Sequence, residues 1–209
     1  SKNSNNKCLK NVNCNKPGEK NKTNFSIHQT RIVKYKRWEK NPSQKGILVF
    51  HEMGTGKTYT GVAFLYMFPN TEKIIICPES IWVTWKKHLE FLNCEIPNTY
   101  YTSYNCIKSF LSQEPKNLQI TLSQIFAGKV IVFDEAHHLI GILNDKMISS
   151  TNKTIFYNAI HKSKKHLLLT GTPFYFDQHD IVYLVNLCHS NANPPLLPFN
   201  RTEFRKEYY

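Results

Sequence analysis

The segment that most constrains this chain is an apolar run, residues 46–50, which leads directly into two glycines and a Lys-Thr pair. The run is partly β-branched and follows a turn-forming sequence at 42–45, so it predicts a short buried strand. Residues 59–68 are mostly apolar and predict a helix. A strand, a glycine loop and a helix in this order are what a phosphate-binding loop requires, because backbone N–H groups at a helix N-terminus bind anions.

Each residue of the loop has a role toward a nucleoside triphosphate. The candidates for nucleotide binding in this loop are Gly54, Thr55, Gly56, Lys57 and Thr58. Lys57 would reach the β- and γ-phosphates, and the Thr58 hydroxyl would bind Mg²⁺. The strict pattern begins with glycine, whereas this chain has His51. The alternative is a Gly-rich turn that arose by chance, and the motifs further along the chain argue against it.

A second apolar run, residues 129–133, ends in two adjacent carboxylates. Open α/β sheets place their chemistry at the carboxyl ends of strands. Asp134 can bind Mg²⁺ directly or through water, and Glu135 can orient and deprotonate an attacking water. Surface acids that merely end a strand are the alternative, but they would leave the order of the motifs unexplained.

A third apolar run, residues 166–169, ends in two hydroxyls separated by a glycine. Thr170, Gly171 and Thr172 could bond to the loop after Asp134 and couple the nucleotide site to a second site. His137 could relay the state of the γ-phosphate in the same way. An ordinary strand-to-loop turn is the alternative for this segment considered alone.

These blocks resemble the first RecA-like lobe of superfamily 2 helicases and translocases, in particular the Swi/Snf-type branch and its relatives in large DNA viruses. The viral relatives include the poxvirus-type early transcription factor ATPase and nucleoside triphosphatase I. The blocks that carry the resemblance are Glu52-Met53-Gly54-Thr55-Gly56-Lys57-Thr58, Asp134-Glu135-Ala136-His137 and Leu169-Thr170-Gly171-Thr172-Pro173. The resemblance implies an α/β fold, a RecA-like P-loop NTPase lobe with a mostly parallel sheet and helices on both faces. The alternation of strand and helix patterns predicts the same architecture.

Weaker blocks of the resemblance imply further site residues. Gln29 matches the glutamine that contacts adenine. Pro78 and Ser80 lie in a block similar to a motif that binds the nucleic-acid backbone, and Thr102 and Ser103 lie in a similar block further on. Trp85 follows in the predicted helix 80–92, where it could either pack in the core or contact nucleic acid.

The chain departs from the family pattern in two places. Family members carry Asn after the third block, where this chain has Asp177. They also have a second RecA-like lobe, and the four arginines of this chain do not lie in motifs of that lobe. We therefore expect residues 25–209 to be an N-terminal RecA-like ATP-binding domain cut from a longer protein.

The chain has a net charge of +12 that is concentrated near its start, since residues 1–45 contain twelve Lys/Arg and two acids. Residues 1–24 are rich in Lys and Asn, so we expect a basic, disordered tail. This tail either adds contacts to nucleic-acid phosphates or is a solvated linker. The six cysteines fit no zinc pattern, which indicates free thiols, with Cys8 and Cys14 as half a metal site as the alternative. No signal peptide or membrane-length apolar run is visible.

These features together predict an ATP hydrolase that uses ATP and Mg²⁺ and moves along nucleic acid. DNA is the expected partner, RNA is the alternative, and transcription machinery is a further expected partner. A nucleotide-sensing scaffold without turnover and the motor lobe of a restriction or repair complex are competing functions. We expect an intracellular protein and, if it is viral, one in the virion or the host cytoplasm, without a membrane partner.

Overall fold

The computed structural model describes most of the chain after residue 43 and a short piece before it. The described residues are 9–11, 44–52, 54, 56–91, 96, 98–172, 177–189 and 197–208. Most of the basic tail predicted at 1–24 lies outside these residues.

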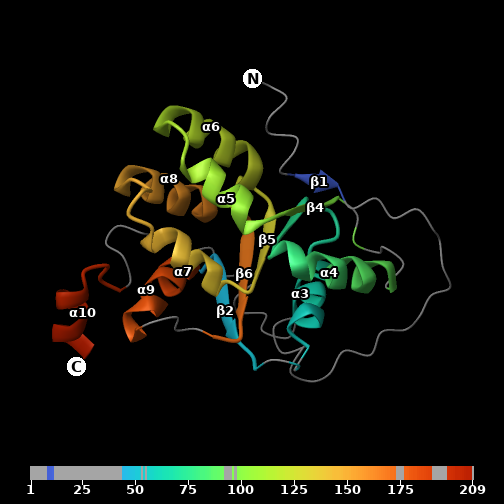
Figure 1. Ribbon diagram of the computed structural model, residues 1–209. Helices are drawn as coiled ribbons and strands as arrows, with labels where there is room; N and C mark the ends of the chain where they lie inside the picture. The colour runs from blue at the N-terminus through green and yellow to red at the C-terminus, as the bar shows by residue number, and fades with distance from the viewer. Residues whose placement is uncertain are drawn as a thin grey trace.

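A single six-stranded sheet forms the centre of the protein (Figure 1). Its strands are β1 (Lys10–Asn11), β2 (Gly46–Phe50), β3 (Lys73–Ile76), β4 (Thr99–Thr102), β5 (Val130–Asp134) and β6 (Lys165–Thr170). They lie in the order β1-β4-β3-β5-β6-β2. All neighbouring strands are parallel except β1, which pairs antiparallel with β4. The predicted mostly parallel sheet is confirmed. Lys10 and Asn11 were expected to be disordered, and the structure differs by placing them in a strand.

Helices cover both faces of the sheet (Figure 1). On one face lie α3 (Lys57–Tyr66) and α4 (Glu79–Phe91). On the other face lie α5 (Tyr104–Leu111), α6 (Pro115–Phe126), α7 (His137–Asn144), α8 (Ser150–His161) and α9 (Ile181–Cys188). The predicted helices on both faces are therefore confirmed, and the fold is that of a RecA-like lobe.

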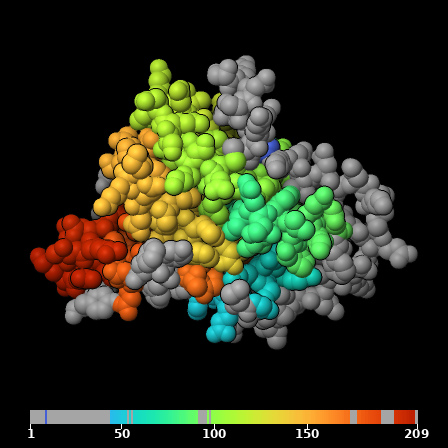
Figure 2. Space-filling model, in the orientation of Figure 1, coloured from blue at the N-terminus to red at the C-terminus, as the bar shows by residue number. Residues whose placement is uncertain are grey.

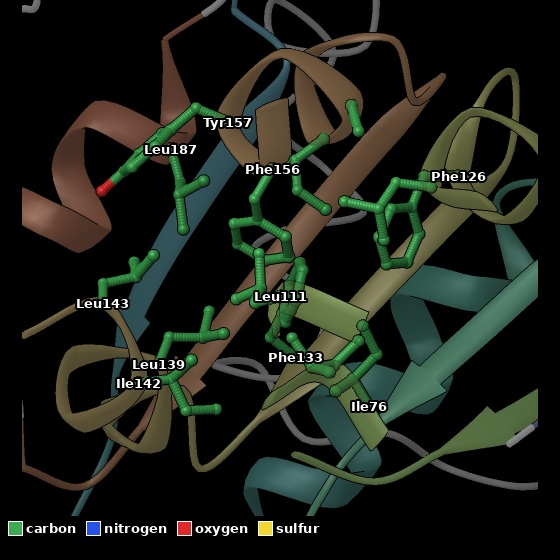
Figure 3. Packing of buried hydrophobic residues seen from close by; sticks show 14 of the residues in the cluster. Ile76, Leu111, Phe126, Phe133, Leu139, Ile142, Leu143, Phe156, Tyr157 and Leu187 are labelled. Carbon is green, nitrogen blue, oxygen red and sulfur yellow. The ribbon is translucent and has the colours of Figure 1, made fainter. Parts of the chain in front are cut away.

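Alternate residues of each central strand supply the two cores. In β5, Ile131 and Phe133 belong to the larger core, whereas Val130 and Val132 belong to the core beneath α3 and α4. Such strands read as continuous apolar runs because both of their faces are buried. In the larger core, Phe126, Phe133 and Phe156 pack among leucine and isoleucine side chains from the sheet and the helices (Figure 3). Burial on both faces explains why the runs of β5 and β6 were recognisable as strands, whereas β2 lies at the edge of the sheet and is only partly buried.

Two helices of the larger core were not predicted. Helix α5 begins after Ser103, whose side chain accepts a hydrogen bond from the backbone N–H of Cys106. Helix α7 begins directly after the acidic motif, and its buried residues include Leu139 and Leu143. Each helix has eight residues, which is too short for its apolar periodicity to stand out from an irregular segment.

The last described element, α10 (Arg201–Tyr208), lies at one edge of the molecule beside α9 (Figures 1 and 2). Arg201 and Arg205 approach the Asp177 carboxylate at 3.5 and 3.7 Å. Asp177 also caps the short 3₁₀ helix η2 (Gln178–Asp180), because its side chain accepts a hydrogen bond from the backbone N–H of His179. The residue that departs from the family pattern therefore links α10 to the start of η2.

Cys77 and Cys188 are free thiols, as expected. Cys106 is disulfide-bonded, so the expectation of free thiols is wrong for that residue. Within the part of the chain that the structure describes, no helix combines the length and apolarity needed to cross a membrane.

Candidate active site

The predicted catalytic groups meet at the carboxyl end of the sheet. Lys57 is the first residue of α3, and its Nζ lies 2.9 Å from Oε1 of Glu135. The other carboxylate oxygen of Glu135 lies 3.3 Å from Nδ1 of His137, and that nitrogen lies 3.2 Å from Oγ1 of Thr170. The three sequence motifs therefore form one continuous polar cluster, although 78 residues separate Lys57 from Glu135.

The glycine loop leads into α3 through a backbone conformation that residues other than glycine rarely adopt. Gly54 has φ of 81° and Gly56 has φ of 85°, both in the left-handed region where a side chain causes strain. Gly56 occupies the N-cap position of α3, and its carbonyl accepts a hydrogen bond from the backbone N–H of Thr60. Lys57 and Thr58 therefore lie in the first helical turn, where backbone N–H groups point toward the loop.

Glu135 is held in an unusual conformation and a polar environment. Its φ is 54°, which is uncommon for a residue other than glycine and is found at functional sites. The hydrogen bond with His137, followed by the ammonium of Lys57, lowers the pKa of Glu135 to about 2. Glu135 is therefore a carboxylate at neutral pH, bonded on one side to a cation and on the other to an imidazole.

Asp134 lies deeper than Glu135 and has different partners. It is only 2% exposed, and burial raises the pKa of its carboxyl group, while a hydrogen bond from Trp85 acts in the opposite direction. The indole Nε1 of Trp85 donates to Oδ2 at 2.7 Å, and the backbone N–H of Glu135 donates to Oδ1 at 3.0 Å. The hydroxyl of Tyr104 donates to the Asp134 carbonyl at 2.9 Å. The sequence left the role of Trp85 open, and the structure places it in the core as a partner of Asp134.

Thr170 connects the glycine loop to the third motif. Its carbonyl accepts a hydrogen bond from the backbone N–H of His51 at 3.1 Å. Its hydroxyl donates to the Thr172 carbonyl and accepts from the Thr172 backbone N–H, both at 3.1 Å. Gly171 lies between the two threonines, so this segment forms a tight turn. Thr170 is fully buried, whereas Thr172 is exposed.

The four nucleic-acid candidates fall into two environments. Ser80 is exposed in the first turn of α4, and Pro78 directly precedes this helix. Thr102 and Ser103 are 1% and 4% exposed, and Ser103 caps α5. Both residues are buried, and the Ser103 side chain accepts a hydrogen bond from the Cys106 backbone N–H; their contact with a nucleic-acid phosphate stays a prediction.

Two nucleotide-binding candidates, Gln29 and Thr55, lie outside the described residues, and so does Pro173 of the third block. Among the residues that are described, no group of three or more His, Cys, Asp or Glu side chains could hold a metal ion. The oxygen donors expected for Mg²⁺ are the Asp134 carboxylate and the Thr58 hydroxyl. Such hard oxygen donors fit Mg²⁺, which is usually bound by one or two carboxylates together with phosphates of the substrate.

Comparison with known proteins agrees with this geometry. The model of a family described as the SNF2-related domain matches residues 28–195. A putative ATP-dependent RNA helicase of Acanthamoeba polyphaga mimivirus is 27% identical over 182 residues, which cover 87% of this chain and 36% of the relative. A termination factor NPH-I homolog of African swine fever virus is 28% identical over 177 residues, which cover 78% of this chain and 24% of the relative.

A solved structure has the same fold. The SWI2/SNF2 ATPase core of Sulfolobus solfataricus, determined in complex with dsDNA, matches with a TM-score of 0.58 and 22% sequence identity. The match covers 94% of this chain and 41% of that chain. The chain therefore spans about a quarter to two fifths of the length of these three proteins.

Proposed function

The chain belongs to the SNF2-related domain family, and from that premise we propose that it is the ATP-binding lobe of an enzyme that couples ATP hydrolysis to movement along DNA. The observation that carries the proposal is the contact between Lys57 of the glycine loop and Glu135 of the acidic motif, at 2.9 Å. The two groups come from different strand ends, so their meeting supports one shared triphosphate site.

The residues divide the work of hydrolysis among themselves. Gly54, Gly56 and the first turn of α3 would bind the phosphates through backbone N–H groups. Lys57 would exchange the Glu135 carboxylate for the β- and γ-phosphates. Glu135, relieved of the ammonium, would then become a stronger base and could orient and deprotonate the attacking water.

Mg²⁺ is the cofactor that the donor set fits. Thr58 and Asp134 would hold it, and the ion would neutralise the charge that develops on the phosphates. Gln29 would contact the adenine. The coupling between the nucleotide site and nucleic acid would run through the residues that join the loop of Glu135 to the end of β6. These residues are His137, Thr170, Gly171 and Thr172.

DNA is the proposed nucleic acid, and transcription is the proposed process. The first proposal is supported by the archaeal SWI2/SNF2 core, which was determined with dsDNA, and the second by the viral termination factor homolog. RNA remains the competing partner because another relative is named a putative RNA helicase. Pro78 and Ser80 at the start of α4 are the proposed backbone contacts. We also propose an intracellular site of action, in the virion or host cytoplasm if the protein is viral.

A second RecA-like lobe would complete the site in the full-length protein, because this chain covers only 36% and 24% of the length of two relatives. Residues 25–209 would then be the N-terminal lobe, preceded by a basic tail at 1–24. The 209-residue chain alone is expected to hydrolyse ATP slowly, since half of the site would be absent.

The test is an ATPase assay on the full-length protein. The rate of phosphate release is measured without nucleic acid and then, separately, with duplex DNA, with single-stranded DNA and with RNA. The rate of phosphate release should rise severalfold with DNA, and Lys57→Ala should abolish both the basal and the stimulated rate. A rate that no nucleic acid changes would favour the nucleotide-sensing scaffold. Normal turnover in the Lys57→Ala variant would overturn the assignment of the phosphate site.

A further inference from the structure

Trp85 is the only tryptophan among the fully buried side chains of the described residues, and it lies next to the acidic motif. It belongs to α4, yet its indole Nε1 reaches Oδ2 of Asp134 at the end of β5, at 2.7 Å. Both groups are buried, so this is a hydrogen bond from a neutral donor to a desolvated acid. A buried indole N–H requires an acceptor, and here the acceptor is the carboxyl group proposed to bind Mg²⁺.

The hydrogen bond from Trp85 helps to fix the orientation of the Asp134 carboxyl group. Oδ2 is bonded to the indole, and Oδ1 is bonded to the backbone N–H of Glu135. The hydroxyl of Tyr104 fixes the backbone carbonyl of the same residue. With a donor on each oxygen, the plane of the carboxylate is fixed, and the remaining lone pairs point in set directions.

The other edge of the indole contacts the helix that follows the glycine loop. A Cβ atom built on Gly61 of α3 would lie 2.6 Å from Cη2 of Trp85, closer than real Cβ atoms approach. Gly61 is three residues after Thr58, so both lie on one side of α3. The indole therefore lies between α3 and Asp134, and only a glycine at position 61 lets it lie so close to the helix.

We propose that Trp85 is a positioning residue, which sets the orientation of Asp134 and its separation from Thr58 so that the two can share one Mg²⁺ ion. This inference rests on the proposed function, because it assumes that Asp134 and Thr58 hold the ion of a Mg²⁺-nucleotide complex. Partners that orient metal ligands in this way change metal affinity by about 10- to 100-fold when they are removed.

The test measures how strongly Mg²⁺ increases the affinity of the full-length protein for a fluorescent ATP analogue. Trp85→Phe keeps an aromatic ring in the core and removes the donor, together with part of the indole ring system. The variant should reduce the Mg²⁺-dependent gain in affinity by about tenfold or more. Its affinity in EDTA should stay within about twofold of the wild type, because the indole bonds to Asp134 and packs against Gly61, and the proposed role of Asp134 is exerted through the metal.

Trp82→Phe is the matched control, since it makes the same change on the same helix. Trp82 stacks on Tyr101 with ring centroids 4.1 Å apart. This variant should keep the full Mg²⁺-dependent gain. Thermal unfolding without nucleotide, measured on both variants, separates a loss of folding from a loss of metal coupling.

A second pair of variants tests the geometry without removing the donor. Gly61→Ala should displace the indole and reduce the Mg²⁺-dependent gain, although alanine favours a helix more than glycine does. Gly141→Ala in α7 is its control, because a Cβ atom there meets nothing within 4 Å.

The outcomes separate the two proposals. A wild-type protein whose nucleotide affinity does not depend on Mg²⁺ would overturn both. If the wild type shows the gain and Trp85→Phe and Gly61→Ala keep it, only the positioning role is overturned. An equal loss of affinity with Mg²⁺ and with EDTA would also contradict it, because it would indicate a general structural defect.

Discussion

The two ends of the sheet use charge in opposite ways. At the carboxyl end, charged side chains from distant segments contact one another, as Lys57 and Glu135 do at 2.9 Å. At the amino end, lysines near the starts of the strands bond mainly to backbone carbonyls of neighbouring turns. Nζ of Lys73 donates to the Thr71 carbonyl at 2.7 Å, and Nζ of Lys165 donates to the Gln44 carbonyl at 2.8 Å.

The difference follows from the direction of the chain in a parallel α/β sheet. At the amino end of the strands, the connecting segments present backbone carbonyls that a buried lysine can bond, such as those of Thr71 and Gln44. Helices begin at the carboxyl end, where free N–H groups attract anions. A lysine therefore stabilises the fold at one end, whereas the same side chain at the other end can bind a phosphate. The position of a lysine in the sheet therefore decides whether it stabilises the fold or can bind a phosphate.

The largest effect should come from Glu135 at the carboxyl end. Glu135→Gln removes the proposed base and should lower ATP turnover of the full-length protein by about 10²- to 10⁴-fold. Nucleotide affinity and thermal stability should change little, because Gln keeps the size and the hydrogen-bonding oxygen of Glu. Equal turnover in variant and wild type would place the base elsewhere and remove the contrast between the two ends.

Removing a buried lysine at the amino end should lower the stability of the fold and leave nucleotide binding unchanged. Lys73→Met leaves the carbonyls of Thr71 and Pro69 without this donor, which should destabilise the fold by about 1 to 3 kcal/mol in denaturant unfolding. Nucleotide affinity should be unchanged. Lys116→Met, at an exposed site in α6, is the control and should shift stability by less than about 0.5 kcal/mol. Lost nucleotide binding with retained stability would contradict the structural role.

His166 makes the stability of the amino end depend on pH. It is fully buried in β6, and burial lowers its pKa to about 3, whereas the unfolded value is close to 6.5. The folded state therefore resists protonation, so its stability is retained above about pH 6.5 and falls as the pH drops toward 3. Between pH 7 and 5 the loss should be about 2 kcal/mol.

His166→Gln is the variant that isolates this contribution. Both proteins share every other histidine, so the difference between the two stability curves reports on His166 alone. The wild type should lose about 2 kcal/mol more than the variant over this range in denaturant unfolding. Parallel curves would show that this imidazole does not resist protonation in the fold.

The smallest effect is expected for a partly exposed ion pair at the amino end. Nζ of Lys129 lies 3.0 Å from Oε2 of Glu72, whose side chain is about half exposed. Such pairs contribute about 0.2 to 1 kcal/mol, and salt weakens them. A double-mutant cycle with Lys129→Ala and Glu72→Ala should give a coupling energy in this range at low salt. A much larger value would mean that the amino end, too, depends on contacts between charged side chains.

The strands and the phosphate site were predictable because local sequence determines them. The runs around Leu48, Val132 and Leu168 are apolar on both faces, and each ends at its motif. The conformation of Gly54 and Gly56 follows from a loop that only glycine forms readily. Because the strands are parallel, the motifs that follow them lie at the same edge of the sheet. The contact between the glycine loop and the acidic motif could therefore be predicted from the sequence.

Other features depend on tertiary contacts that no single segment encodes. The hydrogen bond from Trp85 to Asp134 joins α4 to the end of β5, 49 positions further along the chain, across the core that the two elements share. The burial of Thr102 and Ser103 likewise follows from packing around β4 and α5. For Ser103 a local signal was present, since a serine before a short apolar segment is typical of a helix cap.

Strand β6 separates the glycine loop of β2 from the acids of β5, so the two motifs never lie on adjacent strands. Neighbouring strands are about 4.8 Å apart, which puts the tips of β2 and β5 roughly 10 Å from each other. The main chain, through its ladder of peptide hydrogen bonds, thus sets the breadth of the site. Point substitutions can alter which groups reach into that space, but its breadth would change only if the strands paired in a different order.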